Sequence, residues 1–255
     1  MNRNSQHPAI ILRISPMGEI HAGVDVLTRD AGLLRATAYG LRSRRGSLRG
    51  KVVPFSRGIL YLYTDPRRES PKVTDYDVDR YAQAIAQDLT AFYHGNLWAE
   101  VIWRSRASGE EGPVVFDLLA EALDLMEQRV ATGTRQDVQL LSSVFLWRYL
   151  GLLGLRPELG ACASSDRFMA AEEPRFYSRR DGTVVAHEWA EPGMIPVPSG
   201  TARLLQTTDR LALPDATVLP VTAATMTATR TFLLAAIQDA IEVPLNTLKV
   251  AAGAL

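Results

Sequence analysis

The spacing of apolar residues changes once along this chain, near residue 78, and that change constrains the fold more than any other feature. Before it, short segments rich in β-branched and aromatic residues are separated by turns; after it, apolar residues recur every three to four positions. A period near two predicts strands, and a period near 3.6 predicts amphipathic helices. The chain is therefore predicted to be an α+β protein of more than one domain, with the strands first.

The N-terminal part, residues 1–80, has the strand content of a small barrel. Its β-rich segments are separated by turns such as Arg29-Asp30-Ala31-Gly32, and such turns favour antiparallel pairing. Five short strands in a module of this size are typical of an OB-fold barrel, whose closure removes exposed sheet edges. The predicted strands are residues 9–14, 24–28, 33–39, 59–63 and 72–78.

The C-terminal part, residues 81–255, is predicted to be an α-helical domain. An irregular insertion at about residues 156–200 interrupts it, because prolines and glycines break the helical period there and residues 175–186 resemble a hairpin. The predicted helices are one that begins near residue 81 and includes residue 93, then residues 114–130, 138–155, 201–211 and 222–241, with a tail after Pro244.

Several features predict a cytoplasmic protein without a membrane partner. The apolar stretch at residues 144–155 contains Arg148 and is shorter than the roughly 20 residues that span a bilayer. The N-terminus has no signal-peptide core. The chain has a single cysteine, Cys162, so no disulfide is expected, as is usual in a reducing compartment.

Charge is distributed unevenly, although the formal net charge is zero. Residues 1–80 contain 14 Lys and Arg against 8 Asp and Glu, a net charge of +6, and residues 81–255 contain 14 against 20, a net charge of −6. An asymmetry of this kind predicts a module that binds a polyanion, joined to one with a different role.

A basic stretch at residues 29–57 carries most of this positive charge, with Asp30 as its one acidic residue. Such a cluster on a small barrel is typical of nucleic-acid binding, and the interleaved aromatics Tyr39, Phe55, Tyr61 and Tyr63 either stack on bases or face the core. The alternative is an ordinary solvated surface. The predicted DNA-binding residues are Arg13, Arg29, Arg35, Arg42, Arg44, Arg45, Arg49, Lys51 and Arg57.

Motifs for catalysis are incomplete. Residues 46–51 resemble a phosphate-binding loop but have three residues between the glycines and Val52 where Ser or Thr is required. His187-Glu188 is half of a zinc-protease motif, and no Gly-x-Ser-x-Gly elbow occurs. The sequence predicts no enzyme.

Along nearly its whole length, the sequence resembles a known family, the bacterial recombination mediator and DNA repair protein RecO. The opening strands and their Leu-Thr-Arg-x-x-Gly turn at residues 27–32 are similar to those of the family, as is the basic loop that leads into Pro54-Phe55. Residues 152–162 resemble the approach to the family's first zinc cysteine, and residues 243–249 resemble its closing Pro-Leu-x-Ser-Leu pattern.

The chain departs from this family at the zinc site. Many relatives have two Cys-x-x-Cys pairs that hold a structural zinc, but here Ser165 stands at the second position of the first pair and the second pair is absent around His187 and Ala190. Structural zinc sites need four good ligands. We therefore expect no metal and no cofactor, and a degenerate zinc-finger-like insertion.

The resemblance implies a mediator that binds single- and double-stranded DNA, anneals complementary strands and, with RecR, helps to load RecA on strands coated by single-strand-binding protein. It also implies contact between the helical domain and the acidic C-terminal tail of single-strand-binding protein, for which Arg135 and Arg148 are candidates. RNA binding is a variant of this prediction. The alternative is a protein-interaction adaptor whose OB-like barrel does not bind DNA.

Overall fold

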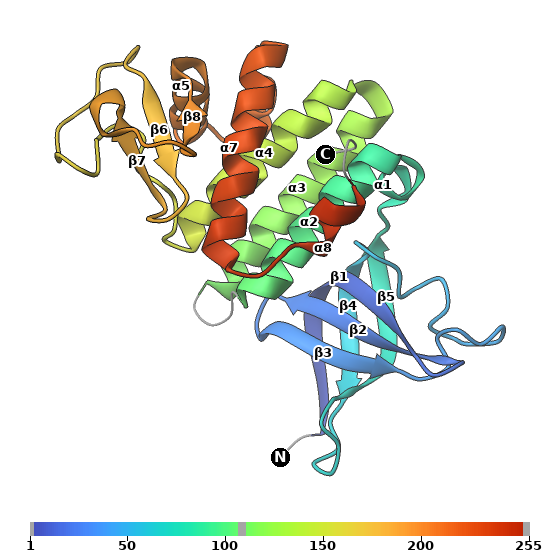
Figure 1. The fold of residues 1–255 in the computed structure, drawn as a ribbon. Coiled ribbons are helices and arrows are strands. Elements are labelled where there is room, and N and C mark those ends of the chain that lie inside the picture. The colour runs from blue at the N-terminus through green and yellow to red at the C-terminus, as the bar shows by residue number, and fades with distance from the viewer. Residues whose placement is uncertain (1–2, 107–110, 252–255) are drawn as a thin grey trace. The chain divides into compact units, whose positions relative to one another are not determined.

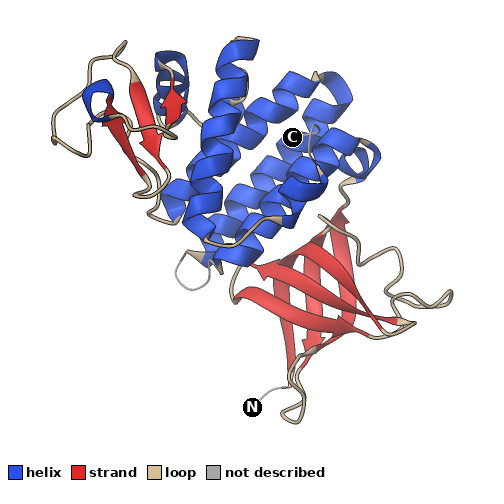
Figure 2. Ribbon diagram, in the orientation of Figure 1, coloured by secondary structure: helices blue, strands red, loops and turns tan. Residues whose placement is uncertain are grey.

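The computed structural model, which describes residues 3–106 and 111–251, has five strands followed by helices and a second, small sheet (Figures 1 and 2). The first five strands form a closed barrel in the order β1-β2-β3-β5-β4. The predicted OB-fold barrel and the α+β class are confirmed. The strands are β1 Asn4–Met17, β2 His21–Thr28, β3 Gly32–Ala38, β4 Arg57–Tyr63 and β5 Lys72–Arg80.

Alternation along the strands gives the barrel an apolar interior and a polar outer wall. In β2, Val24 and Val26 point inward, and in β4 Leu60 and Leu62 do so, all at 3% exposure or less. The residues between them point outward, because successive side chains of a strand face opposite sides. The outer wall can therefore carry cations and tyrosines without disturbing the core.

The first predicted helix is wrong in one respect, because the structure has two helices there. Strand β5 continues to Arg80, and α1 stops before Asp88, whose side chain accepts a hydrogen bond of 2.8 Å from the Ala91 N–H and so caps α2. The helices in this part are α1 Gln83–Gln87, α2 Leu89–Ser105, α3 Gly112–Thr132 and α4 Arg135–Leu152.

The irregular insertion contains a small sheet of order β7-β6-β8. The predicted hairpin is confirmed as β6 and β7, whereas β8 is an additional edge strand, and α8 forms within the predicted tail. The elements are β6 Arg175–Ser178, β7 Thr183–Ala186, the 3-10 helix η1 His187–Trp189, β8 Ile195–Val197, α5 Ser199–Thr208, α6 Leu213–Ala216, α7 Ala223–Ile241 and α8 Asn246–Val250.

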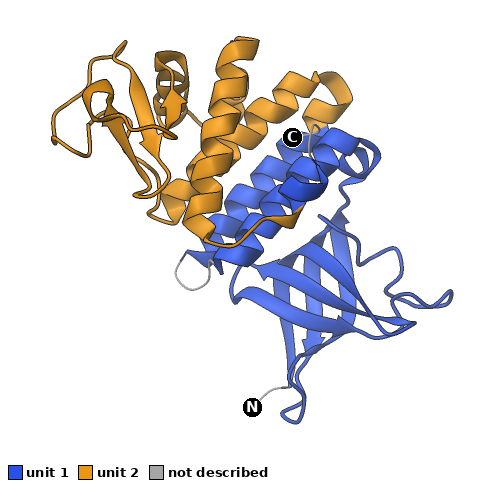
Figure 3. Cartoon of the chain, viewed as in Figure 1, with its two compact units in different colours: residues 1–127, 247–254 blue, residues 128–246, 255 orange. Residues whose placement is uncertain are grey.

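The chain divides into two compact units, residues 1–127 with 247–254 and residues 128–246 with 255 (Figure 3). The first unit contains the barrel together with α1, α2 and most of α3. The separation at residue 80 follows the change from strands to helices and stays a prediction about independent domains. Among the residues that the structure describes, no helix is both long enough and apolar enough to cross a membrane.

Candidate nucleic-acid interface

The segment between β3 and β4, residues 40–56, is a basic loop fixed to the barrel by apolar anchors. Leu41, Leu48 and Val52 are buried in the barrel core, at 7% exposure or less. The backbone N–H of Arg42 donates to the carbonyl of Ile20 in the β1–β2 turn. The loop therefore has a defined position, although it contains no helix or strand.

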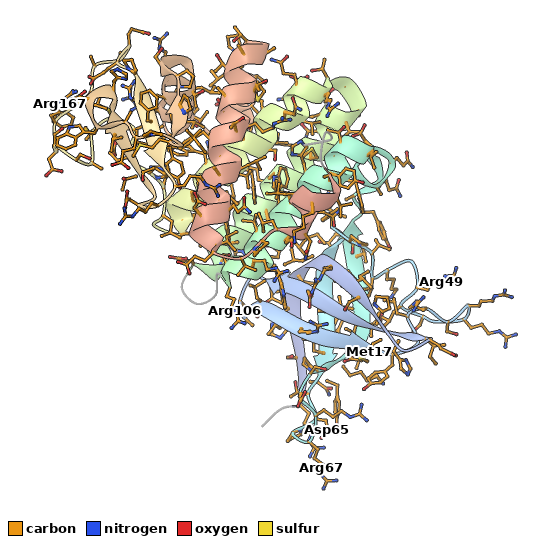
Figure 4. All side chains as sticks on the ribbon, in the orientation of Figure 1. Met17, Arg49, Asp65, Arg67, Arg106 and Arg167 are labelled. Carbon is orange, nitrogen blue, oxygen red and sulfur yellow. The ribbon has the colours of Figure 1, made fainter. Side chains whose placement is uncertain are left out.

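Four arginines of the basic loop project into solvent. Arg42, Arg44, Arg45 and Arg49 are exposed, and Figure 4 shows Arg49 pointing away from the barrel. Arg42 donates to the backbone carbonyl of Gly18 at 3.3 Å, and no acceptor within the described residues lies within hydrogen-bond distance of the other three side chains. None of the four forms an ion pair with a described carboxylate, so the positive charge of these four side chains is not neutralised within the described residues.

Lys51, at the end of this cluster, is different because it forms an ion pair. Its Nζ lies 2.8 Å from Oδ1 of Asp75 on β5. This hydrogen bond raises the pKa of Lys51 and lowers the pKa of Asp75. A phosphate must compete with Asp75 for this ammonium group.

Arg29 and Arg57 attach α3 to the barrel. Arg29 donates to both carboxylate oxygens of Asp117 at 2.9 Å, and Arg57 donates to both oxygens of Asp124 at 3.1 and 2.9 Å. The bond with Asp117 raises the pKa of Arg29, and the pKa of Asp117 is lowered in return. A guanidinium group that is already paired with a carboxylate neutralises less phosphate charge, so fewer counterions leave the DNA when it binds. These two arginines therefore contribute less to a DNA site than their charge suggests.

Arg13 and Arg35 lie on the outer wall on either side of a buried carboxylate. Asp25 of β2 is opposite Arg13 of β1 and Arg35 of β3 in the sheet register. Its side chain is 1% exposed, 2.7 Å from Arg13 and 3.6 Å from Arg35, while both arginines are about half exposed. The three together carry one net positive charge and present two guanidinium groups to solvent.

The four aromatics of the basic stretch do not share one environment. Phe55 is buried, 3% exposed, and its ring lies against Phe92 and Gly95 of α2, so it cannot stack on a base. Tyr39 is exposed, whereas Tyr61 and Tyr63 are half-buried on the outer wall.

Sequence reasoning missed the cations that follow β4. Arg67 and Arg68 are in the β4–β5 loop, and Lys72 is the first residue of β5; all three are exposed. Figure 4 shows Asp65 and Arg67 at the tip of this loop. The signal was present in the sequence Pro66-Arg67-Arg68-Glu69-Ser70-Pro71-Lys72. It places two cations between two strands and a third at the start of the second strand, where loops of OB-folds bind oligonucleotides.

The two candidates for the protein-tail site have different environments. Arg148, on α4, donates to the carbonyls of Thr208 and Leu211 at 3.2 and 2.6 Å, so its guanidinium group holds the end of α5. Arg135 is exposed at the first position of α4, directly after the N-cap residue Thr134.

The residues at the position where the resemblance places the family's zinc ligands do not fit a structural zinc. The Cys162 thiol is buried and accepts a hydrogen bond from the Ala186 N–H at 3.3 Å. Burial opposes ionisation, but the hydrogen bonds from Ser165 and the backbone outweigh it, so the pKa of the thiol is lowered. In the described ranges no three His, Cys, Asp or Glu side chains are grouped as metal ligands.

Two arginines organise this insertion. Arg167 lies 2.5 Å from Glu173 and 2.5 Å from Glu188 of η1. The hydrogen bonds that Glu173 accepts from Arg167 and from the Ala170 N–H lower the pKa of Glu173 to about 2. Arg175 is 3% exposed and donates to the carbonyls of Leu159, Ala170, Ala171 and Glu173 at 2.7–3.2 Å.

Comparison with known protein families gives two matches that together cover nearly the whole chain. Residues 1–81 match the model described as recombination protein O N terminal. Residues 86–249 match the model described as recombination protein O C terminal. The resemblance found in the sequence motifs is confirmed.

Proposed function

Since this chain belongs to the recombination protein O family, whose members are recombination mediators in DNA repair, we propose that it binds single- and double-stranded DNA through the basic loop. One observation carries this proposal: four exposed arginines, Arg42, Arg44, Arg45 and Arg49, form no ion pair with a described carboxylate, on a loop held by buried leucines. Each cation that meets a phosphate releases a condensed counterion, which favours binding at low salt.

Strand annealing follows from contacts of this type. Arginines that bind phosphate fix the position of a strand without reading its sequence, and they leave the base edges accessible. Two strands whose phosphates are neutralised repel each other less, so complementary bases can pair. The protein then acts without chemistry of its own, in keeping with a family that is generally non-enzymatic.

The same proposal includes the protein partners of a mediator. The chain acts with RecR, removes the barrier posed by single-strand-binding protein, and so helps RecA to load. For the acidic tail of single-strand-binding protein, Arg135 is the better candidate because its side chain is exposed, whereas that of Arg148 is partly buried. Binding of a labelled tail peptide should weaken in Arg135→Ala, and unchanged binding would remove this residue from the site.

The first test is fluorescence anisotropy of a labelled single-stranded oligonucleotide at several salt concentrations. Affinity should fall linearly on a log–log plot against salt, and it should collapse in a variant with Arg42, Arg44 and Arg45 changed to Glu. Absent or salt-insensitive binding would contradict the proposal and favour the adaptor alternative. Nuclease or ATPase activity of the purified chain would contradict the non-enzymatic part.

A further inference from the structure

A hollow of about 520 Å³ lies on the outer wall of the barrel, separate from the tip of the basic loop. It lies where the start of β5 meets the ends of β3 and β4, because Lys72 pairs with Thr37 on one side and with Tyr63 on the other. We refer to it as the tyrosine pocket. Its lining residues are Tyr39, Tyr63, Asp65, Arg68, Lys72 and Thr74.

The tyrosine pocket combines an accessible aromatic ring with two cations. Tyr39 is 37% exposed, and its ring meets the ring of His21 edge-on, with centroids 4.9 Å apart. The guanidinium carbon of Arg68 and Nζ of Lys72 lie over the Tyr39 ring, 5.5 and 5.9 Å from its centroid, so a base that stacks on the ring must share its surface with these cations or displace them. Arg68 also donates a hydrogen bond to the Tyr39 hydroxyl. These contacts hold the ring in one orientation before any ligand binds.

The charge of the pocket is positive. Asp65 is its one lining carboxylate, and it lies 3.7 Å from Nε of Arg68. Lys72 makes no ion pair with any described carboxylate and is exposed. Tyr63 receives a hydrogen bond from Arg3 at 3.3 Å, which brings a third cation close to the rim. A ligand with one flat aromatic part and one anionic part suits this lining.

A nucleotide has these two parts. Every base has a face that can stack on a tyrosine, and OB-folds use aromatic rings in this way for single strands. The volume is within the range of roughly 300–1,000 Å³ that small-ligand sites have. We infer that the tyrosine pocket binds one unstacked nucleotide of a single strand, with its base on Tyr39 and its phosphate at Arg68 and Lys72. This inference rests on the proposed DNA binding.

The tyrosine pocket would give the barrel a preference for single-stranded over double-stranded DNA, which the basic loop alone does not provide. In a duplex both faces of a base are covered by its neighbours, so the base cannot reach Tyr39 unless it leaves the stack. Phosphates are present in both forms of DNA. The basic loop is therefore expected to bind both forms, and the tyrosine pocket to favour single strands.

The test compares Tyr39→Leu with Tyr81→Leu, a matched control. Tyr81 is 43% exposed and does not line the pocket. Loss of one base stack should weaken single-strand binding about 5-fold or more, while duplex binding and the salt slope should stay as in the wild type. Tyr81→Leu should bind both forms normally. Thermal unfolding of each variant shows whether it is folded.

A second measurement uses the unaltered protein, so it does not depend on how a variant folds. An oligonucleotide containing 5-iododeoxyuridine should crosslink on irradiation to Tyr39 or Tyr63, as mapped by mass spectrometry of the peptides. The double variant Arg68→Gln with Lys72→Gln removes the contact with that one phosphate, so it should lower the single-strand salt slope by about 0.7.

The outcomes separate this inference from the proposed function. If the wild type binds DNA and loses binding with the loop variant, but Tyr39→Leu binds normally and no crosslink reaches Tyr39 or Tyr63, the tyrosine pocket is overturned and the basic loop stands. Equal losses for single strands and duplex in Tyr39→Leu also overturn base stacking. If the wild type binds no oligonucleotide, both proposals fall.

Discussion

Neutralising three arginines of the basic loop tests how much of the DNA affinity is electrostatic. Arg42, Arg44 and Arg45 are exposed and form no ion pair with a described carboxylate, so each is free to bind one phosphate. Changing all three to Gln leaves shorter polar side chains that still donate hydrogen bonds, while it removes three positive charges. Because no ion pair of the fold is lost, stability should be unchanged.

The expected magnitude follows from the number of cations. Each phosphate contact contributes about 0.7 to the slope of log affinity against log salt for single strands and about 0.9 for duplex. Three contacts therefore lower the slope by about 2 for single strands. At about 1 M salt this electrostatic contribution vanishes, so the variant and the wild type should bind equally there. A slope lower by about 2 then makes the variant's affinity at about 0.1 M salt roughly 100-fold lower than that of the wild type, which is about 2.7 kcal/mol of binding free energy.

The assay is fluorescence anisotropy of a labelled oligonucleotide at salt concentrations between about 0.05 and 0.3 M. Affinity that depends on phosphate contacts changes strongly with salt in this range. A control variant has Arg180, Arg203 and Arg210 changed to Gln; these arginines are exposed and belong to the second unit. The control has the same net charge as the loop variant. Equal slopes for the two variants would refute the basic loop as the DNA site and leave only a net-charge effect.

Three further predictions concern charged groups outside the basic loop. Asp25→Asn removes the carboxylate between two outer-wall arginines. If the outer wall contacts DNA, this variant should steepen the single-strand salt slope by up to about 0.7. An unchanged slope would show that the outer wall does not contact DNA. Arg175→Met should lower the free energy of unfolding by roughly 3 kcal/mol in denaturant titrations, because buried carbonyls lose their donors; an unaltered midpoint would contradict this. The pKa of Glu173 is lowered to about 2, so its stabilising effect should be full above its ordinary pKa and disappear as the pH falls towards 2. Thermal unfolding of Glu173→Gln should then match the wild type at pH 2 and lie below it at pH 6.

The period of the apolar residues predicted the barrel and most helices, because it records which side of each element is buried. It failed at one local helix cap and at one tertiary contact. The period continues across Asp88, whose side chain nevertheless caps α2 and ends α1. Helix α8 has only five residues, and its Thr247 N–H donates to Glu100 of α2 at 2.7 Å. The spacing of the apolar residues does not indicate that Glu100 accepts this hydrogen bond.

Strand β8 was missed for a different reason. Its three residues include Pro196, and proline argues against a central strand because it has no N–H to donate. The prediction of irregular structure holds for residues 190–194 before it, whereas α5 begins at Ser199, two residues after the strand. Pairing with β6 on one edge of the small sheet needs few donors, so a short strand with a proline can form there.

The sequence predicted which residues of the candidate site are charged but not which carboxylates pair with them. Arg29 and Arg57 were grouped with the loop arginines because they are close in sequence. Their carboxylates are 88 and 67 residues away along the chain, and no local pattern connects them. Counting cations therefore identified the basic module but overstated the number of its arginines that form no ion pair.

What distinguishes the basic loop is the combination of free charge with a fixed backbone. A flexible basic segment would lose conformational entropy when it becomes ordered on DNA, at a cost of about 1–2 kcal/mol for each residue fixed. Here Leu41, Leu48 and Val52 are buried in the barrel, so folding has already restricted the residues between them. These apolar residues contact no phosphate in the proposed site. They nevertheless support its affinity, because they hold the guanidinium groups apart and in solvent, where each can meet a phosphate without the backbone first being ordered.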